Sequence, residues 1–276
     1  MRTVSILNLK GGVAKTFTAV NMAYELHRRG FKVLLIDNDK QGNLSKAYGR
    51  YNADEIAPIA RLLSGEWQRA GEIIQPTDYK GIDIITSNMS LFGATWNLTK
   101  EDDENQIERY KRLKDAAVLG HGWAAIDYLP IVQAYDYCII DNPPDIGLNV
   151  VNALAITDEV IVPVKIDEDA LEGLDIVAEQ IEEARVFNER LHLRGVLVTV
   201  YQNTDGEAAG VEWLRQQWSD VSSERYRKYL ILGTIRYSRK VAENSFMRKP
   251  IYEYSPCCGA AQDYKKFVTR YTGKER

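Results

Sequence analysis

Short apolar runs recur along this chain and alternate with segments that have helical spacing. Seven apolar runs stand out, at residues 4–7, 33–36, 82–85, 138–140, 160–164, 196–200 and 230–235. Several of them are continuous rather than alternating in polarity, which is typical of strands that are buried on both faces. Strands that alternate with helices predict an α/β protein with a doubly wound, mostly parallel β-sheet that is flanked by helices on both faces.

Helical patterns fill three of the intervals between these runs. The first covers residues 16–29 and ends at Gly30, a residue suited to the cap that closes a helix. Longer patterns cover residues 104–119 and 169–190. The 276 residues contain no internal repeat, low-complexity tract or clean linker, so we expect residues 1–276 to form a single domain.

A loop with two adjacent glycines follows the first apolar run and precedes the first helical pattern. Its sequence is Lys10-Gly11-Gly12-Val13-Ala14-Lys15-Thr16. Such a loop builds a phosphate cradle, because its N–H groups and the helix N-terminus both face an anion. Lys15 would reach the β- and γ-phosphates of a nucleotide, and the Thr16 hydroxyl would ligate Mg²⁺. The alternative is a plain glycine turn, since the standard P-loop has glycine where this chain has Leu9 and Ala14.

Three aspartates follow two of the apolar runs. Asp37 and Asp39 come after the run at 33–36, and Asp141 comes after the run at 138–140. Ligands of open α/β sheets bind at the carboxyl ends of strands, which is where all three would lie. An apolar strand that ends in a carboxylate fits a Walker B position, where Asp141 would hold a water bound to Mg²⁺. For residues 37–43, a helix-capping loop rich in Asp and Asn is the alternative.

Composition and charge narrow the class of protein. Hydrophobic residues make up 45% of the chain and charged residues 27%, which fits a soluble globular protein. No apolar run approaches the roughly 20 residues that span a bilayer, and the chain enters a strand at once, so we expect no signal peptide and no stable membrane insertion. Three cysteines provide no disulfide framework, which suits a reducing cytoplasm.

The charge is unevenly distributed. Residues 224–276 hold 13 Lys or Arg against 5 Asp or Glu, whereas the rest of the chain is acidic. This basic segment suggests a face that binds a polyanion. Its densest part lies around the run at 230–235, and the candidates for DNA contact there are Arg236, Arg239 and Lys240, with Arg225, Arg227 and Lys228 before the run. The alternative is that these cations pair with the acidic body of the protein.

The glycine loop resembles the deviant Walker A motif, KGGxxKT, of the ParA/MinD family of ATPases. Residues 37–43 resemble that family's D-x-D-P-Q-G-N, with Lys40 in place of proline, and residues 136–144 resemble its D-Y-x-x-x-D-x-P-P. Further blocks at 87–91, 163–174 and 235–251 are similar to the family too. The similarity covers nearly the whole chain and is weakest at 46–80 and 202–229.

The resemblance implies a P-loop ATPase of the short-form ParA type that hydrolyses ATP slowly to ADP with Mg²⁺. It implies that Asp39 orients the attacking water, that Lys15 is catalytic, and that Lys10 reaches the phosphates of a second copy in an ATP-dependent homodimer. The implied metal shell is Thr16, Asp37 and Asp141. The implied nucleotide cradle is Lys10, Gly11, Gly12, Val13, Ala14, Lys15, Thr16 and Phe17.

The family also implies a biological role and partners. The ATP-bound dimer would bind nonspecific DNA, and a ParB-like centromere-binding protein would stimulate hydrolysis, so the protein would partition plasmid or chromosomal DNA. We expect it in the cytoplasm, on the nucleoid when ATP is bound. The sequence shows no N-terminal helix-turn-helix segment, so operator recognition would fall to another protein.

Three other functions fit part of the sequence. A MinD-like membrane-positioning ATPase is the nearest, because residues 261–271 can be drawn as an amphipathic helix, although we expect that helix to pack on the core. A small-molecule or metal-cluster ATPase, such as the nitrogenase iron protein, would need cysteines in cluster-binding positions, which this chain lacks. A kinase is compatible with the glycine loop alone, but the later blocks disfavour it.

Overall fold

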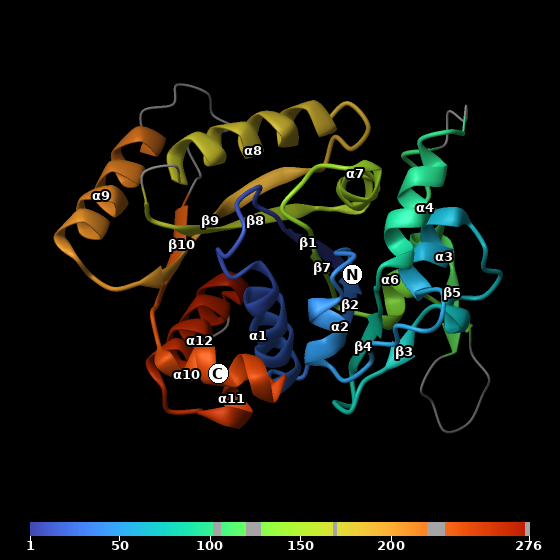
Figure 1. Cartoon of the computed structure of the whole chain (residues 1–276), viewed down its shortest axis with the longest axis horizontal. Helices are drawn as coiled ribbons and strands as arrows, with labels where there is room; N and C mark the ends of the chain where they lie inside the picture. Colours follow the sequence, from blue (N-terminus) through green and yellow to red (C-terminus); the bar gives the residue numbers. More distant parts are fainter. Residues whose placement is uncertain (102–105, 120–127, 168–169, 220–229, 274–276) are drawn as a thin grey trace.

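One large sheet runs through the molecule, as the sequence predicts. The computed structural model describes residues 1–101, 106–119, 128–167, 170–219 and 230–273. Eight strands are ordered β10-β9-β8-β1-β7-β2-β4-β3 (Figure 1), and every neighbouring pair is parallel except β3 with β4. Their bounds are β1 Arg2–Ile6, β2 Val33–Asp37, β3 Gln75–Pro76, β4 Ile82–Ile85, β7 Tyr137–Asp141, β8 Glu159–Lys165, β9 His192–Tyr201 and β10 Leu230–Arg236. The α/β fold with a doubly wound, mostly parallel sheet is confirmed.

All seven apolar runs form strands of this sheet, and most of the helices lie between them. Two of the predicted helices are confirmed, α1 (Lys15–Arg28) and α8 (Ala170–Ala184), and Gly30 after α1 has a φ of 86°. The other helices are α2 Asn43–Ala47, α3 Pro58–Ser64, α4 Ser90–Leu98, α5 Lys111–Asp115, α6 Ile131–Ala134, α7 Leu148–Ile156, α9 Asp205–Ser219, α10 Arg239–Met247, α11 Ile251–Tyr254 and α12 Gly259–Thr272.

The helix predicted over residues 104–119 is wrong for the part that the structure describes. Only α5 forms there, and the backbone becomes extended at Ala116. The chain then enters β5 (Ala117–Leu119), which pairs with β6 (Tyr128–Pro130) in a separate two-stranded sheet. Residues 102–105 lie outside the described part of the chain. Pairing with β6, the next strand in the chain, overrides the local helical spacing here.

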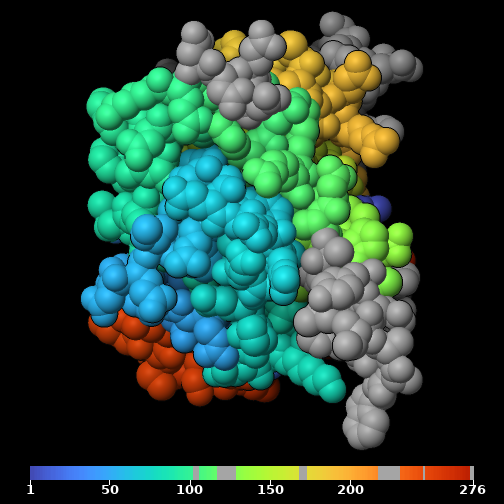
Figure 2. Space-filling model, turned by 90° about the vertical axis from the view of Figure 1, so that its right-hand side faces the viewer, coloured from blue at the N-terminus to red at the C-terminus, as the bar shows by residue number. Residues whose placement is uncertain are grey.

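Helices cover both faces of the sheet, which explains why its strands are apolar throughout. Val33 and Leu35 of β2 belong to the cluster that includes side chains of α1 and α12, whereas Leu34 and Ile36 belong to the cluster of α3, α4 and α5. All four are fully buried. A third cluster joins β8 and β9 to α7 and α8. Figure 2 looks onto the side that lies to the right in Figure 1, where the cyan to green atoms of the region of α3 and α4 form much of the surface.

The amphipathic pattern near the C-terminus forms α12, and its apolar side faces the core. Tyr264, Phe267, Val268 and Tyr271 are buried among side chains of α1 and the sheet, and Tyr264 shares a hydrogen bond with Thr18 of α1. This packing confirms the expectation that the stripe belongs to the core, and it removes the argument for a membrane-binding helix. Over the residues that the structure describes, the helices are too short or too polar to span a bilayer.

The sheet brings the predicted site together at one edge. β1 lies between β8 and β7, and β2 lies on the other side of β7. Asp141, the last residue of β7, is in register with Ile6 on β1 and with Asp37 on β2. The glycine loop after β1 therefore meets the loop after β2 (residues 38–42) and the loop after β7 (residues 142–147) at the carboxyl ends of adjacent strands.

Candidate active site

The glycine loop leaves space for a close ligand. Gly11 and Gly12 are exposed, and a Cβ atom added to either would meet nothing within 4 Å. Gly12 has a φ of 76°, and Ala14, the residue before α1, has a φ of 63°. A left-handed conformation costs a residue with a Cβ about 1–2 kcal/mol, so the loop holds Ala14 in a strained turn at the start of the helix.

Two polar side chains that the sequence analysis missed hold this loop in place. The Asn8 amide donates to the Pro163 carbonyl at 2.7 Å, and its oxygen accepts from the Lys10 N–H at 2.8 Å. The Thr199 hydroxyl on β9 donates to the Val13 carbonyl at 3.1 Å. Asn8 could have been suspected as a polar residue directly after an apolar run. Thr199 lies within an apolar run and gives no signal in the sequence.

Lys15 is buried beneath the loop. It is the first residue of α1, and its ammonium donates to the Lys10 carbonyl at 2.9 Å. Burial lowers the pKa of Lys15, while the carboxylates of Asp141, Asp39 and Asp145 oppose that shift. The cation is thus held among acidic groups and donates to a carbonyl of the loop itself. A phosphate oxygen that entered the loop would take the place of the Lys10 carbonyl as the acceptor for the Lys15 ammonium.

The Asp141 side chain has the fewest hydrogen bonds of the acidic side chains at the site, among the described residues. It is 1% exposed, and neither carboxylate oxygen has a hydrogen-bond partner among the described residues. Burial and the nearby Asp37 raise its pKa well above the usual value, and the neighbouring Thr16 hydroxyl and Lys15 ammonium oppose the rise only in part. A buried carboxylate beside a hydroxyl is a set of hard oxygen donors that fits Mg²⁺. The residues therefore suit the predicted metal, which would satisfy both orphaned oxygens.

Asp37 is equally buried, but its oxygens have partners. One accepts from the Ser45 N–H at 2.7 Å and from the Ser45 hydroxyl at 2.6 Å, and the other accepts from the Asp39 N–H at 3.3 Å. Burial raises its pKa to about 6. Ser45 in turn accepts from the Ser87 N–H. Asp37 thereby fixes the start of α2 to the sheet, and its predicted place in a metal shell stays a prediction.

Asp39 lies at the accessible end of this loop. It is partly exposed, and one oxygen accepts only from the Gln41 N–H within the described residues, at 2.9 Å. Gly42 closes the turn with a φ of 64°, and a Cβ there would lie 2.6 Å from the Tyr51 ring and 2.7 Å from the Ser87 carbonyl. Only glycine fits that position. The turn therefore presents the Asp39 carboxylate from a fixed backbone, as a residue that orients a water requires.

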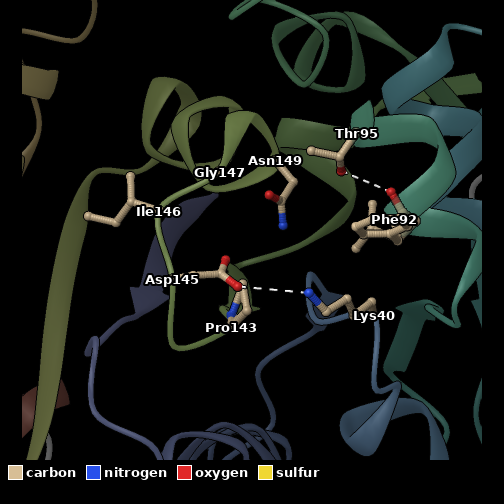
Figure 3. A pocket seen from close by; sticks show the side chains of 9 residues that line it. Lys40, Phe92, Thr95, Pro143, Asp145, Ile146, Gly147 and Asn149 are labelled. Carbon is tan, nitrogen blue, oxygen red and sulfur yellow. Dashed lines mark hydrogen bonds and ion pairs between the residues drawn. The ribbon is translucent and has the colours of Figure 1, made fainter. Parts of the chain in front are cut away.

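A pocket lies where the loops after β2 and β7 meet α4. Lys40 and Asp145 approach each other across it at 4.0 Å, and the Lys40 ammonium lies 5.6 Å from the centre of the Phe92 ring (Figure 3). Lys40 occupies the position where the similar family has proline, so the side chain links the two loops at their surface. The pocket is lined by Lys40, Leu91, Phe92, Thr95, Pro143, Asp145, Ile146, Gly147 and Asn149.

Lys10 points away from its own loop. Its ammonium forms an ion pair with Asp167 at 2.6 Å, and both side chains are about one-third exposed. Asp167 follows β8, the strand next to β1. Lys10 is thus held by its own chain in this structure, and any contact with a second copy would require this pair to open.

The cations proposed for DNA contact lie apart from this site, at the C-terminal side of β10. Arg236 forms two hydrogen bonds with the Asp263 carboxylate, each 2.7 Å long. Lys240 pairs with Glu243 at 2.7 Å. Arg239 is exposed at the start of α10. The other three candidates, Arg225, Arg227 and Lys228, lie outside the described residues.

Known proteins resemble this chain over its full length. A family model described as an AAA domain matches residues 1–193. The chromosome partitioning protein ParA of Caulobacter vibrioides is 30% identical over 279 residues, covering 100% of this chain and 96% of that protein. The sporulation initiation inhibitor protein Soj of Bacillus subtilis is 31% identical over 265 residues, covering 95% of each.

A solved structure shows the same fold. The ATP complex of McdA from Cyanothece superimposes with a TM-score of 0.78 at 18% identity, over 100% of this chain and 98% of that one. The sequence identity to ParA and Soj extends beyond the glycine loop and covers 95–100% of this chain. The chain therefore belongs to the ParA/MinD family of P-loop ATPases, and within that family it is a partition ATPase of the ParA/Soj type.

Proposed function

We propose that this protein is a DNA-partition ATPase that binds ATP with Mg²⁺, dimerises in the ATP-bound form and binds nonspecific DNA as a dimer. Hydrolysis to ADP returns it to the monomer, and a ParB-like centromere-binding partner accelerates that step. The proposal places the protein in the cytoplasm and on the nucleoid while ATP is bound. It treats residues 1–276 as one ATPase domain.

The phosphates lie in the glycine loop, where the backbone N–H groups of residues 11–17 face them. Lys15 binds the β- and γ-phosphates in exchange for the Lys10 carbonyl that it now contacts. Thr16 and Asp141 hold Mg²⁺, and Asp37 contributes from the neighbouring strand. Bound Mg²⁺ neutralises charge on the phosphate oxygens. Phe17 takes part through its backbone N–H, because its ring packs against Tyr264.

Asp39 orients the attacking water. The Gln41 N–H fixes one of its oxygens, and the other accepts no hydrogen bond from the described residues, so the carboxylate can accept one from a water in the site. Lys10 supplies the link to a second copy, whose phosphates it contacts after it leaves Asp167. ATP thus joins two copies, and loss of the γ-phosphate removes the link.

The buried carboxylate of Asp141, whose oxygens have no hydrogen-bond partner among the described residues, carries the ATPase part of this proposal. A charge that costs so much to bury is retained where a bound cation satisfies it. Its position beside Lys15 and Thr16 beneath an open glycine loop is the arrangement that a magnesium–nucleotide complex requires.

The test is phosphate release from ATP by wild-type protein and by Asp39→Ala, with and without Mg²⁺. We expect slow, Mg²⁺-dependent turnover in the wild type. Asp39→Ala should bind ATP normally and hydrolyse it about 10²–10⁴ times more slowly, because it loses the group that positions the water. Asp54→Ala, which removes an exposed carboxylate from a nearby loop, is the matched control and should match the wild type.

One result would overturn the proposal, and a second would remove the role of Asp39 from it. A wild-type protein that releases no phosphate at any Mg²⁺ concentration is not an ATPase. Normal turnover in Asp39→Ala would reduce Asp39 to a loop residue. Equilibrium sedimentation of Asp39→Ala with ATP tests the dimer, which should accumulate because hydrolysis no longer removes it.

A further inference from the structure

Asn38 is a buried residue between Asp37, the last residue of β2, and Asp39 in the loop that follows. Its side chain is fully buried, although the residue is polar and its neighbours Asp37 and Asp39 belong to the site. The Asn38 amide nitrogen donates to the Asn142 side-chain oxygen at 2.9 Å and to the Asn149 carbonyl at 3.2 Å. One side chain therefore binds Asn142, the first residue of the loop that follows β7, and Asn149, the second residue of α7, so its contacts span that loop.

The backbone of Asn38 also forms hydrogen bonds on both sides of the loop that follows β7. Its N–H donates to the Asp141 carbonyl at 2.9 Å, and its carbonyl accepts from the Asn149 amide at 3.0 Å. Asn142, its partner, also donates to the Ile6 carbonyl at the end of β1. The chain of contacts thus runs from the loop of Asp39 through the loop of Asp141 to the strand that carries the glycine loop.

A third element completes this cluster. The Tyr110 hydroxyl donates to the Asn38 side-chain oxygen at 2.8 Å, and Tyr110 is fully buried. Burial raises the pKa of Tyr110, so the phenol remains a protonated donor at every pH at which the protein is folded. Both donors and the acceptor of the Asn38 amide therefore have protein partners, which makes this a satisfied polar network inside the fold.

We propose that Asn38 is a positioning residue that holds the loop of Asp39 and the loop after Asp141 in one fixed arrangement, through Asn142, Asn149 and Tyr110. It touches neither acid's carboxylate, and it acts through the backbones that carry them. The proposal rests on the proposed ATPase function for its effect on turnover. Its structural content, that the two loops move as one unit, stands independently of that function.

The network explains why an asparagine is buried at this point. An apolar residue would leave Tyr110 and Asn142 with unpaired buried groups, each at a cost of about 1–3 kcal/mol. The loops would then be joined by backbone contacts alone. A shift of about 1 Å in a catalytic group can reduce a rate by about 100-fold. Relative motion of these two loops should therefore lower the rate of ATP hydrolysis.

The experiment compares Asn38→Ala and Tyr110→Phe with a control, Asn188→Ala. Asn188 also donates to two backbone carbonyls, those of Leu154 and Thr157, but it lies before β9, at the edge of the sheet opposite the site. Tyr110→Phe removes one hydroxyl and keeps the ring, so it should fold even if Asn38→Ala does not. Melting temperature, ATP affinity and kcat are measured for each variant.

We expect kcat to fall by about 10- to 100-fold in Asn38→Ala and by about 3- to 10-fold in Tyr110→Phe, while the affinity for ATP stays within about threefold. The double variant should be no slower than Asn38→Ala alone, because both changes break one network. Asn188→Ala should lose stability without losing kcat. A kcat equal to the wild type in folded Tyr110→Phe and Asn38→Ala would overturn the proposal, and so would an equal loss in the control.

Hydrogen exchange supplies a readout that needs no activity. Backbone amides of residues 39–45 and those of Asn142, Asp145, Ile146 and Gly147 should exchange about tenfold faster together in both network variants, and not in Asn188→Ala. Faster exchange in only one loop would refute the coupling. If the wild type hydrolyses no ATP, the proposed function fails, and the exchange result still decides whether Asn38 joins the loops.

Discussion

The site at the glycine loop and the basic surface around α10 differ in whether their charged side chains have oppositely charged partners within the chain. At the glycine loop, the Asp141 carboxylate is buried without a partner among the described residues, and Lys15 donates to a carbonyl of its own loop. Around α10, Arg236 donates two hydrogen bonds to Asp263, and Lys240 pairs with Glu243. The first region is incomplete without a ligand, whereas much of the second is already neutralised by its own chain.

This difference shows what a count of charges leaves out. The excess of basic residues in 224–276 suggested DNA contact equally for Arg236, Arg239 and Lys240. A cation that forms a bidentate pair with a carboxylate has part of its charge compensated and its geometry fixed. We therefore rank Arg239 above Arg236 and Lys240 as a DNA contact, and we expect variants in the two regions to differ in both the size and the kind of their effects.

The largest effect is expected from Lys15→Ala. Removing the ammonium should weaken ATP binding by about 100-fold or more, because charge-assisted hydrogen bonds to phosphate are each worth about 1.5–3 kcal/mol and no other described cation lies in the loop's interior. Binding of a fluorescent ATP analogue measures it. Lys32→Ala, an exposed lysine before β2, serves as control and should bind like the wild type. Unchanged affinity in Lys15→Ala would remove the assignment of the phosphate site.

A smaller effect is expected on assembly, from Lys10 and its partner. Lys10→Ala should bind ATP as a monomer but fail to dimerise, because it lacks the link to the second copy. Asp167→Asn should do the reverse and lower the protein concentration needed for the ATP dimer by about threefold to tenfold, since it weakens the 2.6 Å ion pair that must open. Light scattering at several protein concentrations distinguishes the two.

The two Lys10 outcomes are independent of each other. A normal ATP dimer in Lys10→Ala would make Lys10 a surface charge with no role in assembly. An Asp167→Asn variant that dimerises like the wild type would leave the role of Lys10 intact and show that the ion pair does not limit assembly.

Sequence patterns predicted the sheet correctly because its strands are buried on both faces, so each run is apolar whatever lies beside it. They also located the glycine loop, Asp39 and Asp141, because those residues stand at strand ends, where few alternatives exist. They missed Asn8, Asn38 and Thr199, whose partners lie 155, 104 and 186 residues away in the chain. A hydrogen bond over that distance in the chain leaves no local spacing to detect.

On the basic surface, the comparison predicts unequal contributions to DNA binding. With ATP and Mg²⁺, affinity for random duplex should fall with salt, and Arg239→Glu should reduce the log–log slope by about 0.9 for each phosphate that the variant no longer neutralises. Lys240→Glu should have the smaller effect, because Glu243 already pairs with that lysine. Fluorescence anisotropy over a salt series measures both variants, and neither change should alter ATP binding.

The control for this experiment reverses the same charge elsewhere. Lys100→Glu changes an exposed lysine after α4, whose side chains pack on the opposite face of the sheet from α10, and it should leave the slope unchanged. If all three variants weaken binding equally, net charge rather than a defined surface governs the interaction. If wild-type protein ignores random duplex at low salt with ATP and Mg²⁺, the DNA-binding part of the proposed function is wrong.

The smallest effects concern backbone strain, which both regions contain. Ala14 before α1 and Arg248 after α10 have φ values of 63° and 51°, in the left-handed region that glycine adopts freely. Replacing either by glycine should raise the free energy of unfolding by about 0.5–1 kcal/mol, since relief of about 1–2 kcal/mol of strain exceeds the extra entropy of an unfolded glycine. Ala57, which also precedes a helix but has a φ of −62°, is the matched control, and Ala57→Gly should destabilise the protein. Urea denaturation measures all three.

The activity of the two stabilised variants should differ. A stabilised Ala14→Gly whose kcat falls would show that the strain at the glycine loop serves the site. Arg248→Gly should gain stability and keep its turnover, because α10 takes no part in holding the nucleotide.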